Sequence, residues 1–228
     1  SKRNISKGGK TEMKTVCIVG GGPIEQIPDL SEFGKEEIIW IGADKGAITL
    51  LQKGIVPHLA VGDFDSLQDG EFHLIKENVK EIATFPVEKD ATDIELAIEK
   101  AIELKANVIY LFGVTGGRLD HELITIQLLY KLAQQGIKGI ILNEKNWIEL
   151  KLPSKHTIEY DPNFKYISFI PQSEIVTDLT LEGFYYPLHN ETIELGSSIT
   201  VSNYLIGKKG TFSFKEGILL VIKSHDGR

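Results

Sequence analysis

The 228-residue sequence predicts an α/β protein in which a mostly parallel, three-layer α/β domain is followed by an antiparallel β-sandwich domain. Up to residue 136, apolar β-prone runs alternate with helical patterns, which is typical of a parallel sheet covered on both faces. Beyond residue 136 the apolar runs are short and roughly alternating, and glycine, proline and asparagine separate them. That second part contains no convincing helical pattern.

The first part alternates strands with helices. Its expected strands are residues 15–19, 38–41, 59–61, 82–85 and 108–112. Its expected helices are residues 47–52, 69–79 and 119–132, together with one that begins near Asp90 or Thr92. This last helix has the clearest periodicity, with apolar residues every three or four positions at Ile94, Ala97, Ile98, Ala101 and Ile102.

The second part is expected to contain only strands. They are residues 147–152, 165–170, 175–181, 199–205 and 218–222. We place the α/β domain at residues 13–143 and the β-sandwich at residues 144–228. Residues 1–12 are polar and basic and a methionine follows them, so we interpret them as a remnant of recombinant expression and exclude them from the fold prediction.

The composition is that of an ordinary globular protein, with 42% apolar and 25% charged residues. The net charge of −7 argues against nucleic-acid binding, because wide contact with phosphates needs basic surface. No apolar run is long enough to cross a membrane, and no signal peptide is recognisable. Cys17 is the single cysteine, which excludes an intrachain disulfide; we expect a cytoplasmic protein in which Cys17 is a small buried strand residue.

Acidic residues gather after the expected strands of the first part. They are Asp44, Asp63, Asp65, Asp90, Asp93 and Asp120. Parallel strands bring the loops at their C-terminal ends to one edge of the sheet, where ligands bind. Carboxylates that lie close together repel one another unless a cation neutralises them. Because oxygen ligands without cysteine suit Mg²⁺, the sequence predicts a magnesium site at this edge.

Each acidic pair also has a purely structural interpretation. Asp63 and Asp65 fit an acidic surface turn as well, and both can reach one ion only if the chain turns sharply between them. On a helix, Asp90 and Asp93 would lie one turn apart on the same face, where helix capping would explain one acid. We favour metal or ligand contact for Asp93 and leave Asp90 open between the two roles.

The turn at residues 113–118 has the features of a phosphate site. Its glycines expose backbone N–H groups just before an expected helix, and Arg118 can hold phosphate oxygens through two parallel hydrogen bonds. A tight turn with a solvated arginine is the alternative. His121 fits a ligand contact and an ordinary helix residue equally well.

No P-loop is present, and Glu25 occupies the last position of a possible dinucleotide fingerprint.

Four blocks of sequence occur in a specific order and spacing. They are Ala43-Asp44-Lys45-Gly46-Ala47, Gly62-Asp63-Phe64-Asp65-Ser66, Lys89-Asp90-Ala91-Thr92-Asp93 and Gly116-Gly117-Arg118-Leu119-Asp120-His121. Together they resemble the thiamin pyrophosphokinase (thiamine diphosphokinase) family. The resemblance covers essentially everything after Met13, and the later pair Ser202-Asn203 resembles the family's short substrate motif in the β-domain.

The resemblance implies a transferase that converts ATP and thiamin into AMP and thiamin diphosphate. It implies a homodimer in which thiamin lies between the α/β domain of one subunit and the β-domain of the other. The implied Mg²⁺ ligands are Asp63, Asp65, Asp93 and Asp120, and Arg118 completes the catalytic set. The implied ATP contacts are Lys89, Asp90, Thr92, Thr115, Gly116, Gly117, Arg118 and His121. The implied thiamin contacts are Asp44, Ser66, Ser202 and Asn203.

One feature departs from the family's pattern. Animal members place a tryptophan near the C-terminus against thiamin, whereas this chain has only Trp40 and Trp147. Tyr204 is therefore a candidate for stacking on the thiazolium ring, and an ordinary strand residue is the alternative. Two other functions fit parts of the sequence. An aspartate-nucleophile, Mg²⁺-dependent phosphatase would use the acids after the third strand, and a thiamin- or nucleotide-sensing module would bind without turnover.

Overall fold

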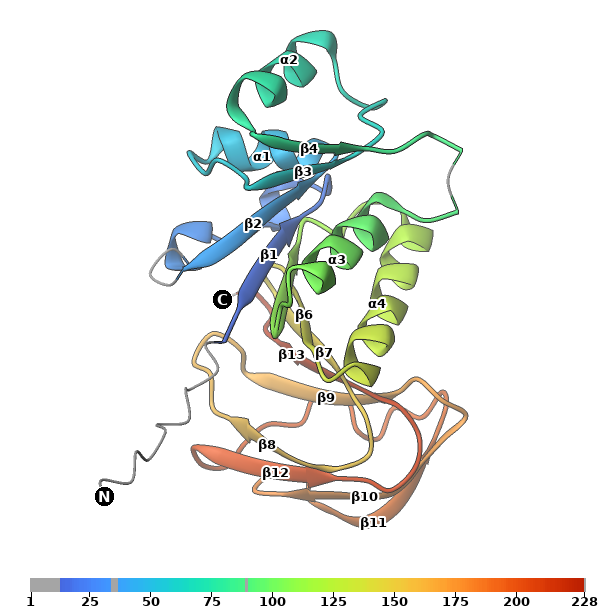
Figure 1. Cartoon of the computed structure of the whole chain (residues 1–228). Helices are drawn as coiled ribbons and strands as arrows, with labels where there is room; N and C mark the ends of the chain where they lie inside the picture. Colours follow the sequence, from blue (N-terminus) through green and yellow to red (C-terminus); the bar gives the residue numbers. More distant parts are fainter. Residues whose placement is uncertain (1–12, 34–36, 89, 228) are drawn as a thin grey trace, which may run out of the picture.

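The structure is a computed structural model that describes residues 13–33, 37–88 and 90–227. The described residues form a nine-stranded mixed sheet and a four-stranded antiparallel sheet (Figure 1). This arrangement confirms the predicted fold class. Residues 1–12, interpreted above as an expression remnant, lie outside the described residues.

The nine-stranded sheet has the strand order β4-β3-β2-β1-β5-β6-β7-β13-β9. Its strands are β1 (Thr15–Val19), β2 (Ile38–Ala43), β3 (Leu59–Gly62), β4 (Glu81–Thr84), β5 (Val108–Phe112), β6 (Lys138–Leu142), β7 (Asn146–Lys151), β9 (Tyr166–Pro171) and β13 (Leu219–Ser224). The smaller sheet has the order β11-β10-β12-β8, with β8 (Lys155–Glu159), β10 (Ile175–Glu182), β11 (Leu188–Glu194) and β12 (Lys209–Ser213). The helices are α1 (Lys45–Gln52), α2 (Asp69–Asn78), α3 (Asp93–Glu103) and α4 (Leu119–Gln134), with the 3₁₀ helices η1 (Ile24–Gln26) and η2 (Leu30–Phe33).

The strands from β4 to β6 are all parallel, so their C-terminal ends reach the same edge of the sheet. Both faces of β1 are buried, which explains why its sequence is a continuous apolar run. Cys17 lies inside this strand and is fully buried, as expected. Burial raises the pKa of its thiol to about 12, so the group stays protonated and unreactive at neutral pH.

Helices cover both faces of the parallel strands (Figure 1). On one face, Ile18 of β1 belongs to the same apolar cluster as Ala97 of α3 and Leu128 of α4. On the other face, Cys17 packs in a cluster with Leu50 of α1. Alternate residues of one strand thus face opposite helical layers. None of the helices in the described residues is long and apolar enough to cross a membrane.

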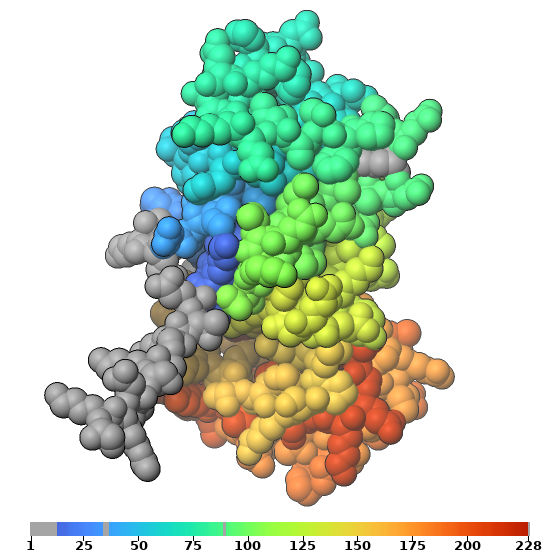
Figure 2. All heavy atoms as spheres, viewed as in Figure 1, coloured from blue at the N-terminus to red at the C-terminus, as the bar shows by residue number. Residues whose placement is uncertain are grey.

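The β-sandwich shares the larger sheet with the α/β part. β7, β13 and β9 extend that sheet with antiparallel strands, and Phe169 and Val221 on two of them pack against Phe212 of the smaller sheet. Figure 2 shows the part from yellow to red directly adjoining the part from blue to green. The boundary between residues 143 and 144 falls in the turn from β6 to β7 of one continuous sheet, and the division into two domains stays a prediction.

Part of the strand prediction for the sandwich was wrong. Residues 199–205 form no named strand, and only single bridges join Asn203 to Ile167 and Leu205 to Phe184. Ser202 has φ 65°, which is incompatible with an extended strand. The prediction also missed β8, β11 and β12, because strands with many exposed polar side chains lack an apolar run; β11 is the clearest case.

Gly46 and Gly70 form a matched pair, because each is the second residue of a helix. A Cβ on Gly46 would lie 1.7 Å from the carbonyl oxygen of Val19, whereas a Cβ on Gly70 would meet nothing within 4 Å. We predict that Gly46→Ala lowers the free energy of unfolding by at least about 2 kcal/mol through overpacking. Gly70→Ala should raise it by about 0.5 kcal/mol through better helix propensity. Urea denaturation measures both changes, and equal shifts would contradict the close packing of α1 on β1.

Candidate active site

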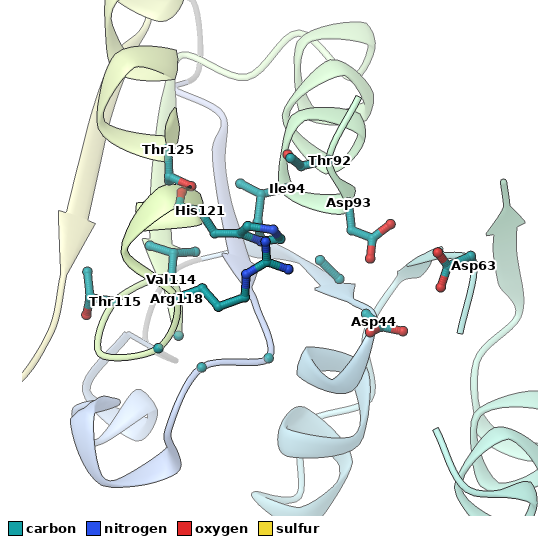
Figure 3. Close-up of a pocket in the computed structure, with 15 residues that line it drawn as sticks. Asp44, Asp63, Thr92, Asp93, Ile94, Val114, Thr115, Arg118, His121 and Thr125 are labelled. Carbon is teal, nitrogen blue, oxygen red and sulfur yellow. Dashed lines mark hydrogen bonds between the residues drawn. The ribbon is translucent and has the colours of Figure 1, made fainter. Parts of the chain in front are cut away.

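A cavity of about 390 Å³ lies at the C-terminal edge of the parallel strands (Figure 3). Its walls come from the segments that follow β1, β2, β3 and β5 and from the first turns of α3 and α4. Acidic side chains from the loops after β2 and β3 and from the start of α3 lie on one side, while Arg118 and His121 reach in from the start of α4 (Figure 3). The cavity therefore has an acidic and a basic side, as a site for a cation beside an anionic ligand requires.

Three carboxylates converge on the acidic side. One oxygen each from Asp44, Asp63 and Asp93 lies within 4.8 Å of the others. The three side chains are partly buried and point toward one another in Figure 3. Clustered carboxylate oxygens with no sulfur or nitrogen ligand among them suit a hard divalent cation. The residues present therefore fit Mg²⁺.

Asp44 is held in place by its backbone and by its side chain. Its φ of 51° and ψ of −121° lie in a region that residues with a Cβ rarely adopt. Its N–H donates a hydrogen bond of 2.8 Å to the carbonyl of Val61, the last residue of β3 that pairs with β2. The hydroxyl of Ser66 donates to Oδ2 of Asp44. Ser66 thus contacts the acidic cluster, and the predicted thiamin contacts of Asp44 and Ser66 stay predictions.

Asp63 and Asp65 occupy a sharp turn, as a shared role for both would require. Phe64 between them has φ 61° and is buried against Phe72 of α2. The N–H of Asp65 donates a hydrogen bond of 2.9 Å to Oδ1 of Asp63. Asp63 joins the carboxylate cluster, whereas Asp65 is exposed and is not among the three grouped residues. The role of Asp65 as a metal ligand stays a prediction.

Helix α3 begins at Asp93, and Thr92 is its N-cap. Oγ1 of Thr92 accepts a hydrogen bond of 3.2 Å from the N–H of Glu95. Asp90 lies before the helix and is exposed, so the expectation that Asp90 and Asp93 share a helix face was wrong. Thr92 and Asp93 line the cavity, and Asp90 does not. Lys89 lies outside the described residues, and its predicted contact with ATP stays a prediction.

Arg118 and Asp120 form a pair at the start of α4. The guanidinium donates two hydrogen bonds to the carboxylate, from Nε at 3.2 Å and from Nη2 at 2.7 Å. This hydrogen bonding raises the pKa of Arg118 and lowers the pKa of Asp120. Asp120 also accepts a hydrogen bond of 2.9 Å from the N–H of His121. Asp120 therefore orients the arginine and is not in the carboxylate cluster, so its metal role stays a prediction.

The glycine-rich turn is fixed by two residues that the sequence analysis missed. Thr115 is only 4% exposed, and its hydroxyl donates to Oε1 of Gln26 at 3.1 Å and accepts from Nδ2 of Asn143 at 3.0 Å. The N–H of Gly116 lies 3.4 Å from a carboxylate oxygen of Glu122. Gly117 lines the cavity. No sequence pattern links Gln26 and Asn143 to this turn, since 89 and 28 positions separate them from Thr115.

The other predicted thiamin contacts lie in the sandwich and do not line this cavity. Asn203 is 3% exposed; its side chain accepts hydrogen bonds from the N–H groups of Tyr186 and Tyr204 and donates to the carbonyl of Tyr186. Its side chain thus ties two loops together. Ser202 is exposed, and Tyr204 stacks on Tyr185 with ring centroids 4.8 Å apart. The thiamin contacts of these residues stay predictions.

The fold and the cavity define a class of protein with two parts. An α/β part carries a cluster of carboxylates that suits a cation at the edge of its sheet, and a β-sandwich is joined to it. The chain matches the family models described as thiamin pyrophosphokinase, catalytic domain, over residues 30–141, and thiamin pyrophosphokinase, vitamin B1 binding domain, over residues 155–219. The chain belongs to the thiamin pyrophosphokinase family.

Similar proteins match nearly the whole chain. Thiamine pyrophosphokinase of Bacillus subtilis (strain 168) is 48% identical over 214 residues, which cover 94% of this chain and 100% of the relative. A crystal structure of the enzyme from Bacillus subtilis superimposes with a TM-score of 0.89 at 47% identity and covers 93% of this chain and 100% of that one. The structure from Geobacillus thermodenitrificans gives a TM-score of 0.86 at 45% identity, with coverages of 93% and 98%.

Because Asp44 lies in the carboxylate cluster, its part in cation binding can be tested without substrate. We predict that Asp44→Asn weakens Mn²⁺ binding by more than about tenfold, because one of the clustered charges is lost. Isothermal titration calorimetry without nucleotide measures this affinity. Asp69→Asn is the matched control, since Asp69 is an exposed carboxylate in the first turn of α2, and it should bind Mn²⁺ like the wild type. Equal Mn²⁺ affinities in the wild type and both variants would show that Asp44 does not contribute to cation binding.

Proposed function

We propose that this chain is a thiamin pyrophosphokinase, which transfers the pyrophosphoryl group of ATP to the hydroxyl of thiamin and releases AMP and thiamin diphosphate. The observation that carries the proposal is the convergence of Asp44, Asp63 and Asp93 beside Arg118 in one cavity. Membership of the family across both parts of the chain supports it, as does the name of the Bacillus subtilis relative.

In this proposal the two sides of the cavity bind different charges. Asp44, Asp63 and Asp93 would hold Mg²⁺, which when bound supplies positive charge that offsets the phosphate oxygens of ATP. Arg118 binds phosphate oxygens with its planar guanidinium, in an orientation set by Asp120. Glycines of the turn at residues 113–118 let its backbone N–H groups approach the same oxygens.

The remaining acidic residues would act around this centre. Asp120 acts through Arg118. The backbone N–H of Asp65 holds the carboxylate of Asp63, and the carboxylate of Asp65 would act directly when ATP is bound. The further ATP contacts that the family resemblance implies are Lys89, Asp90, Thr92, Thr115, Gly116, Gly117 and His121. Thr92, Thr115, Gly117 and His121 line the cavity, which supports their part of this assignment.

The reaction is a displacement at the β-phosphorus of ATP. The hydroxyl oxygen of thiamin forms a bond to this phosphorus, the bond to the oxygen that bridges to the α-phosphate breaks, and AMP leaves. Asp65 or Asp93 accepts the hydroxyl proton. Because such transfers need mainly positioning and charge neutralisation, the contribution of the chain is to hold both substrates in line and to place Arg118 against the developing charge.

We further infer a homodimer in which a second subunit completes the thiamin site. Ser202 and Asn203 are predicted thiamin contacts, and Tyr204 is the candidate for stacking on the thiazolium ring, but none of them lines the cavity of its own chain. Tyr185 and Tyr186 beside them are more than half exposed, as a surface that meets another subunit would be. A cytoplasmic location is part of the same proposal, and it is supported by the single, buried Cys17.

The proposed activity predicts equal amounts of AMP and thiamin diphosphate when the chain is incubated with ATP, MgCl₂ and thiamin. Asp93→Asn should lower kcat by about a hundredfold to a thousandfold, because a positioned charge is lost. Glu99→Gln, an exposed carboxylate on the same helix, should turn over like the wild type. Chromatographic separation of the nucleotides follows the reaction.

Two other results of this assay would contradict the proposed activity. Release of inorganic phosphate without thiamin would indicate a phosphatase. Ligand binding without formation of AMP would indicate a sensing module.

A further inference from the structure

Gln26, Thr115 and Asn143 belong to three separate segments that a ring of hydrogen bonds joins. The hydroxyl of Thr115 donates to Oε1 of Gln26 at 3.1 Å and accepts from Nδ2 of Asn143 at 3.0 Å. The ring closes through the backbone, because the N–H of Glu144 donates to the carbonyl of Gln26 at 3.0 Å. Since Thr115 is buried, removal of either amide would leave its hydroxyl without one of its two partners.

Asn143 is itself firmly held. Its Oδ1 accepts hydrogen bonds from the N–H of Lys145 at 3.0 Å, the N–H of Asn146 at 2.8 Å and Nδ2 of Asn146 at 3.1 Å. These bonds define the turn from β6 to β7. The carbonyl of Glu144 in the same turn lies 2.7 Å from Nε2 of His225, which follows β13. The Asn143 amide therefore links the cavity turn to the antiparallel strands of the larger sheet.

Gln26 packs directly on the glycine-rich turn. A Cβ on Gly116 would lie 2.2 Å from Nε2 of Gln26, and Gly116 has φ 83°. Any other residue at this positive φ would be strained and would displace the Gln26 amide, so the amide and the backbone of the turn lie in close contact. A turn held on both sides keeps its N–H groups and Arg118 in position before a ligand arrives, which avoids an ordering cost on binding.

We propose that Gln26 and Asn143 are positioning residues for ATP, a role that rests on the proposed function. Neither is among the described residues that line the cavity, whereas Thr115, Gly117 and Arg118 are. Gln26 and Asn143 act through Thr115: they fix the turn at residues 113–118, which presents its backbone and Arg118 to the phosphates. The thiamin side of the reaction does not depend on them.

The test uses substitutions that separate this role from the folding of the turns. Asn143→Asp keeps the Oδ1 acceptor that the turn from β6 to β7 needs and removes the donor toward Thr115. Gln26→Leu removes the acceptor, and Gln26→Glu restores one. Asn146→Ala is the matched control, since it removes one bond of the same turn and leaves the ring intact.

Steady-state kinetics should show a KM for ATP raised about tenfold in Asn143→Asp and Gln26→Leu, as expected for the loss of one buried hydrogen bond. The KM for thiamin should stay at the wild-type value, and the melting temperature should fall by only about 2–4 °C, because one buried hydrogen bond is lost. Gln26→Glu should recover part of the affinity for ATP, because it restores the acceptor but places a negative charge beside the phosphate turn. Asn146→Ala should behave like the wild type. A wild-type KM for ATP in the first two variants, or equal increases in the KM for ATP and the KM for thiamin, would overturn the inference.

Equilibrium binding of a fluorescent, non-hydrolysable ATP analogue without thiamin separates this inference from the proposed function. If the wild type forms no AMP, the proposed activity fails. The comparison of analogue affinities still decides the positioning role. Weaker binding by Asn143→Asp and Gln26→Leu supports it, and wild-type affinity in both variants refutes it.

Discussion

The N–H of Asp44, the first residue after β2, donates a hydrogen bond to the carbonyl of Val61 within β3. This bond fixes the direction in which the chain leaves β2, while the register Ala43↔Val61 brings that exit beside the end of β3. Asp44 and Asp63 thus come together although they are far apart in sequence. If the register between β2 and β3 slipped by one residue, the two side chains would lie on opposite faces of the sheet, and the carboxylates would no longer be close together.

The acidic cluster carries a free-energy cost that the surrounding structure offsets. Clustered carboxylates repel one another, and the backbone of Asp44 is strained. The hydroxyl of Ser66 stabilises the carboxylate of Asp44, and the buried ring of Phe64 anchors the turn that carries Asp63. A bound cation would remove the repulsion. A preorganised ionic site keeps its charged groups close together and its backbone strained before the ion binds. The packing of α1, α2 and α3 holds this edge of the sheet in place.

Much of the fold could be predicted from local patterns, because buried parallel strands are continuous apolar runs and α3 has a regular apolar face. Convergence of strand-end acids could be predicted from topology, since parallel strands end at one edge. The orientation of Asp44 could not be predicted, because it depends on a positive φ that no residue pattern encodes. The ring through Gln26 and Asn143 depends on contacts between distant segments. β11 was missed because its side chains are mostly exposed.

Loops from separate strands form one site that suits a cation, beside a turn that suits phosphate. Anomalous diffraction from crystals grown with Mn²⁺ and a non-hydrolysable ATP analogue tests this arrangement most directly. We expect an anomalous peak bordered by Asp44, Asp63 and Asp93, with the triphosphate extending from it toward Arg118. A peak elsewhere on the protein, or a triphosphate bound away from this cavity, would contradict the claim.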